Sequence, residues 1–334
     1  MPRTDSAPRT ATLAEILNDR HATPGPRPPL GARAKYALVI RRFEFLPGYV
    51  PQAVVPGLLG AASWGQLGSL NAVLAMLWSI SGLQVANMAN ALADREQDRR
   101  LKSRQSRAVY GLGVTRVVLH TAVSTLVYAA VAAFLAVRTH HWDLLGYAAA
   151  FLFIGFAYSL PPLHLKSRGI WHLLSLQTGC MLLPGIAILR AYDHATPWAH
   201  VWTLTGFAMV VTSLFVTSHC EDYVVDGQFG TRTYVRALGL AGALYLQSAM
   251  LFLGSLLLLG AIWAIDGPTW GFVPYAVAWL PSQRLLFAAV RVVHRVPLDE
   301  AMDYFHRKSL HGPYHSALMS WATVALAALV LTGR

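Results

Sequence analysis

Long apolar segments run through almost the whole sequence, and they constrain the fold more than any other feature. A helix needs about 20 mainly apolar residues to cross the hydrocarbon core of a bilayer. We predict about nine such spans, approximately at residues 45–65, 67–92, 112–137, 143–162, 170–191, 198–220, 236–264, 269–292 and 314–332. The segments are too long for the alternating strands of a membrane β-barrel. The sequence therefore predicts an all-α, polytopic membrane helix bundle.

The composition agrees with this fold class. Charged residues make up 13% of the chain, whereas about 25% is usual in soluble domains. Pro51 and Pro56 interrupt the first predicted span, and Pro274 and Pro281 interrupt the eighth. Prolines inside a span are tolerated where neighbouring helices satisfy the backbone groups that they free.

Residues 1–40 differ from the rest because they are rich in Pro, Arg, Ala and Thr. Little apolar surface is available there to offset the entropy of ordering, so we expect a disordered, basic, Pro-rich tail. Residues 41–334 form the expected transmembrane domain. The positive residues that precede the first span suit an anionic membrane surface: Arg33, Lys35, Arg41 and Arg42.

The positive residues also predict the orientation of the bundle. They cluster before the first span and after the even-numbered spans, at Arg95, Arg99, Arg100, Lys102, Arg104, Arg107, Lys166, Arg168, Arg232, Arg236, Arg291, Arg295, Arg307 and Lys308. The positive-inside rule then places the N-terminus and these loops on the cytoplasmic side of the cell membrane. Topology and lipid contact account for much of the formal charge of +11. Nucleic-acid binding is therefore not expected, and no nucleic-acid module is visible.

An acidic motif lies where the second apolar segment ends. At helical spacing, its oxygen-bearing side chains share one face: Asn87, Asn90, Asp94 and Asp98. Carboxylates one turn apart repel each other unless a cation lies between them, and Mg2+ prefers such oxygen ligands together with phosphate oxygens. A solvated helix end with unrelated charges is the alternative interpretation for this stretch alone.

The pattern recurs at the end of the sixth apolar segment, which makes the alternative weaker. Asp222 and Asp226 are again four residues apart, Glu221 adds a third carboxylate, and Gly230 is placed to end the helix. Positive-inside orientation puts both acidic motifs on the same side of the membrane, as a shared site requires.

A third segment lies between the acidic motifs. Residues 158–166 read Tyr-Ser-Leu-Pro-Pro-Leu-His-Leu-Lys. Together with Asn90-x-x-x-Asp94-x-x-x-Asp98 and Asp222-x-x-x-Asp226-x-x-x-Gly230-x-x-Thr233, this segment resembles, in order and approximate separation, the motifs of the UbiA superfamily of intramembrane prenyltransferases. The resemblance covers about residues 40–334 and implies the same number of spans as the apolar pattern.

The resemblance implies that the acidic motifs hold Mg2+ and an isoprenyl diphosphate at the cytoplasmic mouth of the bundle. One ion is expected on the first motif and one on the second, and the expected ligands are Asn90, Asp94, Asp98, Asp222 and Asp226. Bound there, the ions would neutralise charge on the leaving group. Lys166 is implied as a direct diphosphate ligand, and Arg232 and Arg168 are further candidates. Tyr158 is expected either to stabilise an allylic cation through its ring or to pack at a helix end.

Several neighbours of the motifs are weaker candidates. His219 and Asn87 are more readily explained as satisfied polar contacts than as a base or a ligand, and Glu221 is open between ligand and support. Cys220 is expected to be a buried small residue. The arginines that alternate with the first acidic motif, Arg95, Arg99 and Arg100, are expected to be solvated or lipid-facing.

The predicted activity is transfer of a prenyl group from an isoprenyl diphosphate to an aromatic or lipid acceptor, with catalytic roles for Asp94, Asp98, Asp222, Asp226 and Lys166. A UbiA-type terpene cyclase, which needs no second substrate, is the alternative. A transporter with buried acids is less favoured, because these acids fall at the ends of spans. Ala91 follows Asn90, where many quinone-pathway members carry Asp, so the acceptor stays open.

Overall fold

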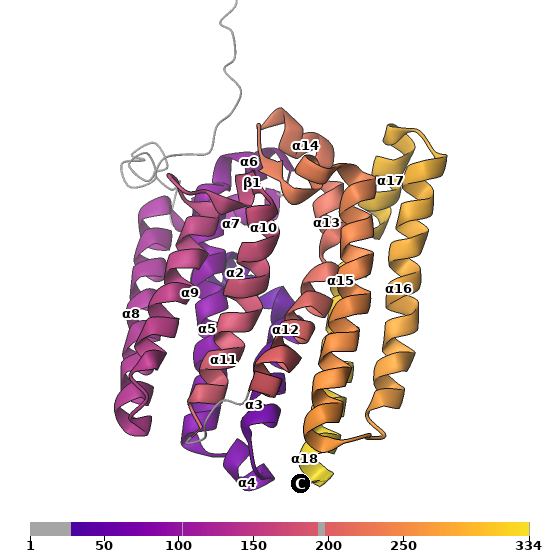
Figure 1. The fold of residues 1–334 in the computed structure, drawn as a ribbon. Coiled ribbons are helices and arrows are strands. Elements are labelled where there is room, and N and C mark those ends of the chain that lie inside the picture. The colour runs from indigo at the N-terminus through magenta and orange to yellow at the C-terminus, as the bar shows by residue number, and fades with distance from the viewer. Residues whose placement is uncertain (1–27, 102, 193–197, 334) are drawn as a thin grey trace, which may run out of the picture.

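The computed structural model describes residues 28–101, 103–192 and 198–333, and these residues form a bundle of long, roughly aligned helices (Figure 1). The elements of its first half are α2 (Leu30–Ile40), η1 (Phe43–Phe45), α3 (Leu46–Gly60), α4 (Trp64–Leu67), α5 (Leu70–Ala93), α6 (Arg95–Leu101), α7 (Ser103–Leu112), α8 (Val114–Thr139) and α9 (Asp143–Ser159). After them come η2 (Leu165–Ser167), β1 (Arg168–Gly169), α10 (Ile170–Ser175), the π-helix η3 (Leu176–Leu182), α11 (Leu183–Arg190), α12 (Trp198–Ser213), α13 (Val216–Glu221), α14 (Tyr223–Gln228), β2 (Arg232–Thr233), α15 (Tyr234–Asp266), α16 (Phe272–Arg295), α17 (Leu298–Lys308) and α18 (His311–Gly333). The predicted all-α membrane bundle is confirmed.

Within the described residues, seven helical segments are long and apolar enough to cross a membrane. The other two predicted spans correspond to shorter helices, namely α3 with 15 residues and α9 with 17 residues. By length and composition alone these two do not qualify as full spans, so the count of about nine remains a prediction.

The predicted tail boundary at residue 40 is wrong, because helix α2 already begins at Leu30. Val39 and Ile40 at its C-terminal end are buried and pack with residues of α5, α7 and α8 in a small core of their own. The segment is only 11 residues long, so its pattern of apolar residues does not distinguish a helix from a disordered tail. Residues 1–27, which carry most of the predicted tail, lie outside the described residues.

Helix α3 shows how proline is accommodated in the bundle. Pro51 has no N–H, so the carbonyl four residues earlier, that of Pro47, is left without its helical donor. The indole Nε1 of Trp321 in α18 donates a hydrogen bond to that carbonyl at 2.9 Å. The expectation that neighbouring helices satisfy freed backbone groups is therefore confirmed at this position.

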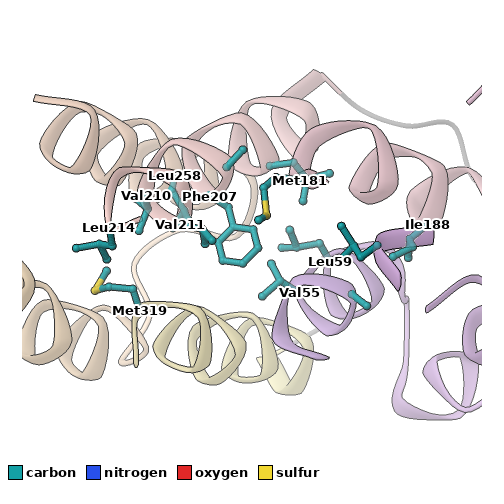
Figure 2. Close-up of a cluster of buried hydrophobic side chains, with 14 of the residues drawn as sticks. Val55, Leu59, Met181, Ile188, Phe207, Val210, Val211, Leu214, Leu258 and Met319 are labelled. Atoms are coloured by element: carbon teal, nitrogen blue, oxygen red, sulfur yellow. The ribbon is translucent and has the colours of Figure 1, made fainter. Parts of the chain in front are cut away.

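The main core lies where α3, η3, α11, α12, α15 and α18 converge, and Figure 2 shows Phe207 of α12 among its apolar side chains. The most extensive helix pair is α12 with α15. Gly206 of α12 and Gly254 of α15 lie against each other, and a Cβ on Gly206 would come within 2.6 Å of the Gly254 carbonyl oxygen. Small residues of this kind let membrane helices approach closely.

The close approach predicts a position-dependent effect of adding one methyl group. A Cβ on Gly254 would lie 2.7 Å from the Met209 Cβ, whereas a Cβ on Gly260, on the same helix, meets nothing within 4 Å. Gly254→Ala is expected to lower the free energy of unfolding by about 1–3 kcal/mol, as overpacking does. Gly260→Ala is the matched control and is expected to be neutral or slightly stabilising. Thermal unfolding in detergent measures both, and equal midpoints for the two variants would contradict this packing.

Candidate active site

The first acidic motif lies at the junction of α5 and α6. Asp94 follows the last residue of α5, and the helical hydrogen-bond pattern continues through it, because the Asp94 amide donates to Asn90 and the Asp98 amide donates to Asp94. The side-chain amide of Asn90 donates to Asp94 Oδ2 at 3.0 Å. Asp98 is buried, with 6% of its surface exposed. The spacing argument therefore holds for Asn90 and Asp94.

Asn87 belongs to a different contact. Its amide donates to the Tyr49 hydroxyl at 3.0 Å and to the Arg41 carbonyl at 3.4 Å. It joins α5 to α3 and to the end of α2, which agrees with the satisfied polar contact expected from the sequence.

Lys166 connects the segment of residues 158–166 to the first acidic motif. Its ammonium forms an ion pair with Asp94 Oδ1, and both side chains are largely buried. Ser159, at the end of α9, donates to the amide oxygen of Asn90 at 3.4 Å. The ion pair thus joins residues 72 positions apart in the chain, and the hydroxyl hydrogen bond joins residues 69 positions apart.

The second acidic motif is held by the start of α15. Asp222 lies between α13 and α14, and Asp226 is buried in α14. Thr233 donates its hydroxyl to Asp226 Oδ2 at 3.2 Å and also accepts from the Arg236 amide as the N-cap of α15. Helix α14 ends before Gly230, whose φ of +67° is readily adopted by glycine. The predicted helix end at Gly230 is therefore confirmed.

A two-residue parallel pairing joins the loops that carry Lys166 and Asp226. Arg168 pairs with Arg232 and Gly169 pairs with Thr233. Figure 1 shows β1, α6 and α14 at the same end of the bundle. Tyr158, near the end of α9, is close enough to both acidic motifs for the charges of Asp94 and Asp226 to act on its hydroxyl. The structure thus brings the predicted site residues to one end of the molecule.

The arginines behave differently from one another. Arg168 and Arg232 are both exposed, and Arg168 donates to the carbonyls of Pro162 and Leu163 in its own loop. Arg168 therefore stabilises its own loop, and Arg232 remains a candidate ligand for the diphosphate. The expectation that Arg95 is solvated or lipid-facing is wrong, because Arg95 is 3% exposed and donates to the Leu92 carbonyl at 2.8 Å.

A cluster of buried and half-buried imidazole and phenol groups lies against the site. The sequence singled out two of its members, Tyr158 and His219, but not His172 and Tyr234. The Tyr158 hydroxyl hydrogen-bonds His172 Nε2 at 2.9 Å, and the His172 ring lies 4.7 Å from the His219 ring, centroid to centroid. His219 Nδ1 in turn hydrogen-bonds the Tyr234 hydroxyl at 3.1 Å. Each member is close in sequence to a site residue, since Tyr234 follows Thr233 and His219 precedes Asp222 by one turn. No local signal marked His172, because its partners Tyr158, His219 and Tyr234 come from three other helices.

The residues present fit Mg2+ by their chemistry. They offer carboxylate oxygens on two loops at one end of the bundle, and Mg2+ is usually held by one or two carboxylates together with substrate phosphates. Among the described residues, no group of three or more His, Cys, Asp or Glu side chains is assembled as a complete cage. Cys220 is fully buried, as expected.

Comparisons with known proteins agree on one family. Residues 53–310 match the UbiA prenyltransferase family. Among solved structures, the chain is similar to a UbiA homologue from Archaeoglobus fulgidus bound to DMAPP and Mg2+ (18% identity, TM-score 0.59, covering 86% of this chain and 99% of that one). It is also similar to a UbiA homologue from Aeropyrum pernix K1 (18% identity, TM-score 0.58, 84% and 96%). A digeranylgeranylglyceryl phosphate synthase structure has 15% identity and a TM-score of 0.58, with 89% and 99% covered. No match was found among curated proteins.

The loop beside Lys166 predicts a pH dependence of stability. Burial is the main cause that lowers the pKa of His164 to about 4, the Lys166 charge adds to it, and Asp94 opposes it. Between pH 6.5 and 4 the unfolded chain, with a pKa of about 6.5 at this residue, binds more protons than the folded chain. The free energy of unfolding therefore falls as the pH drops through this window, and the contribution of neutral His164 is fully present only above it.

His164→Asn is expected to reduce the loss of thermal stability between pH 7.5 and 4.5, because asparagine tolerates the left-handed backbone that His164 adopts with φ of +42°. His140→Asn is the matched control, since His140 is also left-handed with φ of +59° but is exposed. The two variants and the wild type are compared by thermal unfolding at both pH values. An unchanged pH dependence in His164→Asn would show that another group is responsible.

Proposed function

This chain belongs to the UbiA prenyltransferase family, and we propose that it transfers a prenyl group from an isoprenyl diphosphate to an aromatic or lipid acceptor within the membrane. The observation that carries the proposal is the convergence of both acidic motifs and Lys166 on one end of an apolar helix bundle. A charged head at that end and an apolar tail among the helices match the two halves of an isoprenyl diphosphate.

The roles of the site residues follow from their positions. Asp94 and Asp98, assisted by Asn90, would hold one Mg2+, and Asp222 and Asp226 would hold another; bound there, the ions would neutralise charge on the diphosphate as it leaves. Lys166 and Arg232 would bind diphosphate oxygens as cations. The bond between C1 of the prenyl chain and the diphosphate oxygen breaks heterolytically, and the acceptor then forms its bond to C1 and loses a proton.

Tyr158 would lie next to the resulting allylic cation. Its hydroxyl is hydrogen-bonded to His172, so the orientation of its ring is restrained. An aromatic face held in this way stabilises a nearby cation, and preorganised groups of this kind need little rearrangement during the reaction. The surrounding apolar helices would keep water away from the cation until the acceptor reacts.

The relatives and the charge distribution support the proposal. The Archaeoglobus fulgidus homologue was solved with DMAPP and Mg2+ bound, and this chain has the same fold. The positive-inside pattern favours a cell-membrane location with the N-terminus and the mouth of the site in the cytoplasm. The partners implied are an isoprenyl diphosphate, an acceptor and the lipid bilayer.

A cyclase in this family would use the same acidic motifs, so the reaction products distinguish the two activities. The purified full-length protein in lipid nanodiscs is incubated with Mg2+ and geranyl, farnesyl or geranylgeranyl diphosphate, each alone and with a panel of phenols, quinols and glyceryl lipids. A prenylated acceptor supports transfer, whereas a cyclic hydrocarbon or alcohol formed without acceptor supports cyclisation. Mass spectrometry identifies the products.

Removing one acidic ligand is expected to abolish most of this turnover. Asp94→Asn or Asp226→Asn should lower the rate by at least about 100-fold, the usual effect of losing one strong electrostatic contact to a leaving group, and chelation of Mg2+ should do the same. Asp143→Asn is the matched control. Asp143 begins α9, and its carboxylate forms an ion pair with Arg190 at an N–O distance of 2.7 Å. This pair does not include a residue of either acidic motif. Full activity of Asp94→Asn, or equal losses in Asp143→Asn, would contradict the proposed roles.

A further inference from the structure

Both carboxylate oxygens of Asp94 are engaged by donors from the protein. Oδ1 accepts from the Lys166 ammonium, and Oδ2 accepts from the Asn90 amide at 3.0 Å. The oxygen of the Asn90 amide accepts from Ser159. Each oxygen keeps a second lone pair, but a metal ion bound at Asp94 would have to share the carboxylate with the Lys166 ammonium, which already holds Oδ1.

The Lys166 contact is the one that most opposes a cation at Asp94. Lys166 is 8% exposed, and the side chain of Asp94 is 14% exposed, so little water screens the two charges. A divalent cation that approaches Asp94 is repelled by the ammonium and competes with it for the same oxygen. Withdrawing Lys166 without giving it new oxygens would leave a buried ammonium unpaired, which is strongly unfavourable.

A diphosphate removes this obstacle. It offers several anionic oxygens, and a lysine ammonium on its four-carbon chain can reach a new acceptor by rotating about single bonds. Lys166 lies in the short turn η2, next to the β1–β2 pairing that brings the second acidic motif close. A diphosphate bound between the acidic motifs would therefore offer Lys166 new acceptors close to its present position.

We propose that Lys166 couples the binding of the metal ion to the binding of the diphosphate, by occupying Asp94 until a diphosphate gives its ammonium other oxygens. The inference rests on the proposed function. Metal alone binds weakly at the first motif, because it must either displace Lys166 or bind beside its positive charge, in both cases without compensation. Metal and diphosphate together bind strongly, and by thermodynamic reciprocity each raises the affinity for the other.

The test is a Mn2+ titration of the full-length protein in detergent, followed by electron paramagnetic resonance, with and without geranylgeranyl thiodiphosphate as a slowly reacting diphosphate. In the wild type, the analogue is expected to raise Mn2+ affinity strongly. Lys166→Met removes the competing ammonium and keeps an unbranched apolar chain. It is expected to bind Mn2+ without the analogue at least about fivefold more tightly than the wild type, the lower end of typical coupling, and to gain less from the analogue.

Arg232→Met is the matched control, because it removes one positive charge from the paired strand, where Arg232 is exposed. A gain of the same size in Arg232→Met would mean that any nearby positive charge acts in this way, and would overturn the specific role of Lys166. An unchanged Mn2+ affinity in Lys166→Met would also overturn it, since the ion pair would then be only structural.

Stability provides a second readout if Lys166→Met folds poorly. Mn2+ without the analogue should raise the unfolding temperature of Lys166→Met by more than that of the wild type, because ligand binding to the folded state stabilises it. An equal or smaller rise overturns the coupling. If the wild type binds no Mn2+ at a specific site even with the analogue present, the metal-dependent function fails as well, and this result is distinct from a failure of the coupling alone.

Discussion

The ion pair between Lys166 and Asp94 is the interaction on which the polar end of this bundle depends. It joins the end of α5 to the turn after α9, and the β1–β2 pairing then joins that turn to the second acidic motif. Three loops that are far apart in sequence become one surface through these contacts. The positive charge of the buried Lys166 offsets the negative charge of Asp94, which reduces the repulsion of this carboxylate by other acids at the same end of the bundle.

Different interactions stabilise the polar end and the transmembrane core of the bundle. The transmembrane core relies on close contact between small residues and apolar side chains, as at Gly206 and Gly254. The polar end relies on hydrogen bonds and charge, as at Thr233 and Asp226. The membrane provides no hydrophobic drive between helices, so packing positions the spans and the polar contacts position the chemistry.

The sequence predicted the parts of this structure that repeat or that lie within one helical turn. Hydropathy predicted the seven described helical segments that are long and apolar enough to cross a membrane, and a spacing of four residues was sufficient for Asn90 and Asp94. It failed where helices meet, whether these are consecutive or far apart in the sequence. The buried state of Arg95 depends on the junction between α5 and α6, and the pairing of His172 with Tyr158 and His219 depends on three helices meeting. Helix α2 was missed because its packing against α7, rather than its own pattern, stabilises it.

The hydrogen bond from Trp321 to the Pro47 carbonyl links the first long helix of the bundle to the last one. Because synthesis proceeds from the N-terminus, α3 leaves the ribosome long before α18 has been synthesised. During that interval the Pro47 carbonyl cannot accept a hydrogen bond from the Trp321 indole. Water, lipid headgroups or another helix must donate to it instead. Completion of α3 therefore waits for the final span, and a chain that ends before α18 cannot reach the same packing at its beginning.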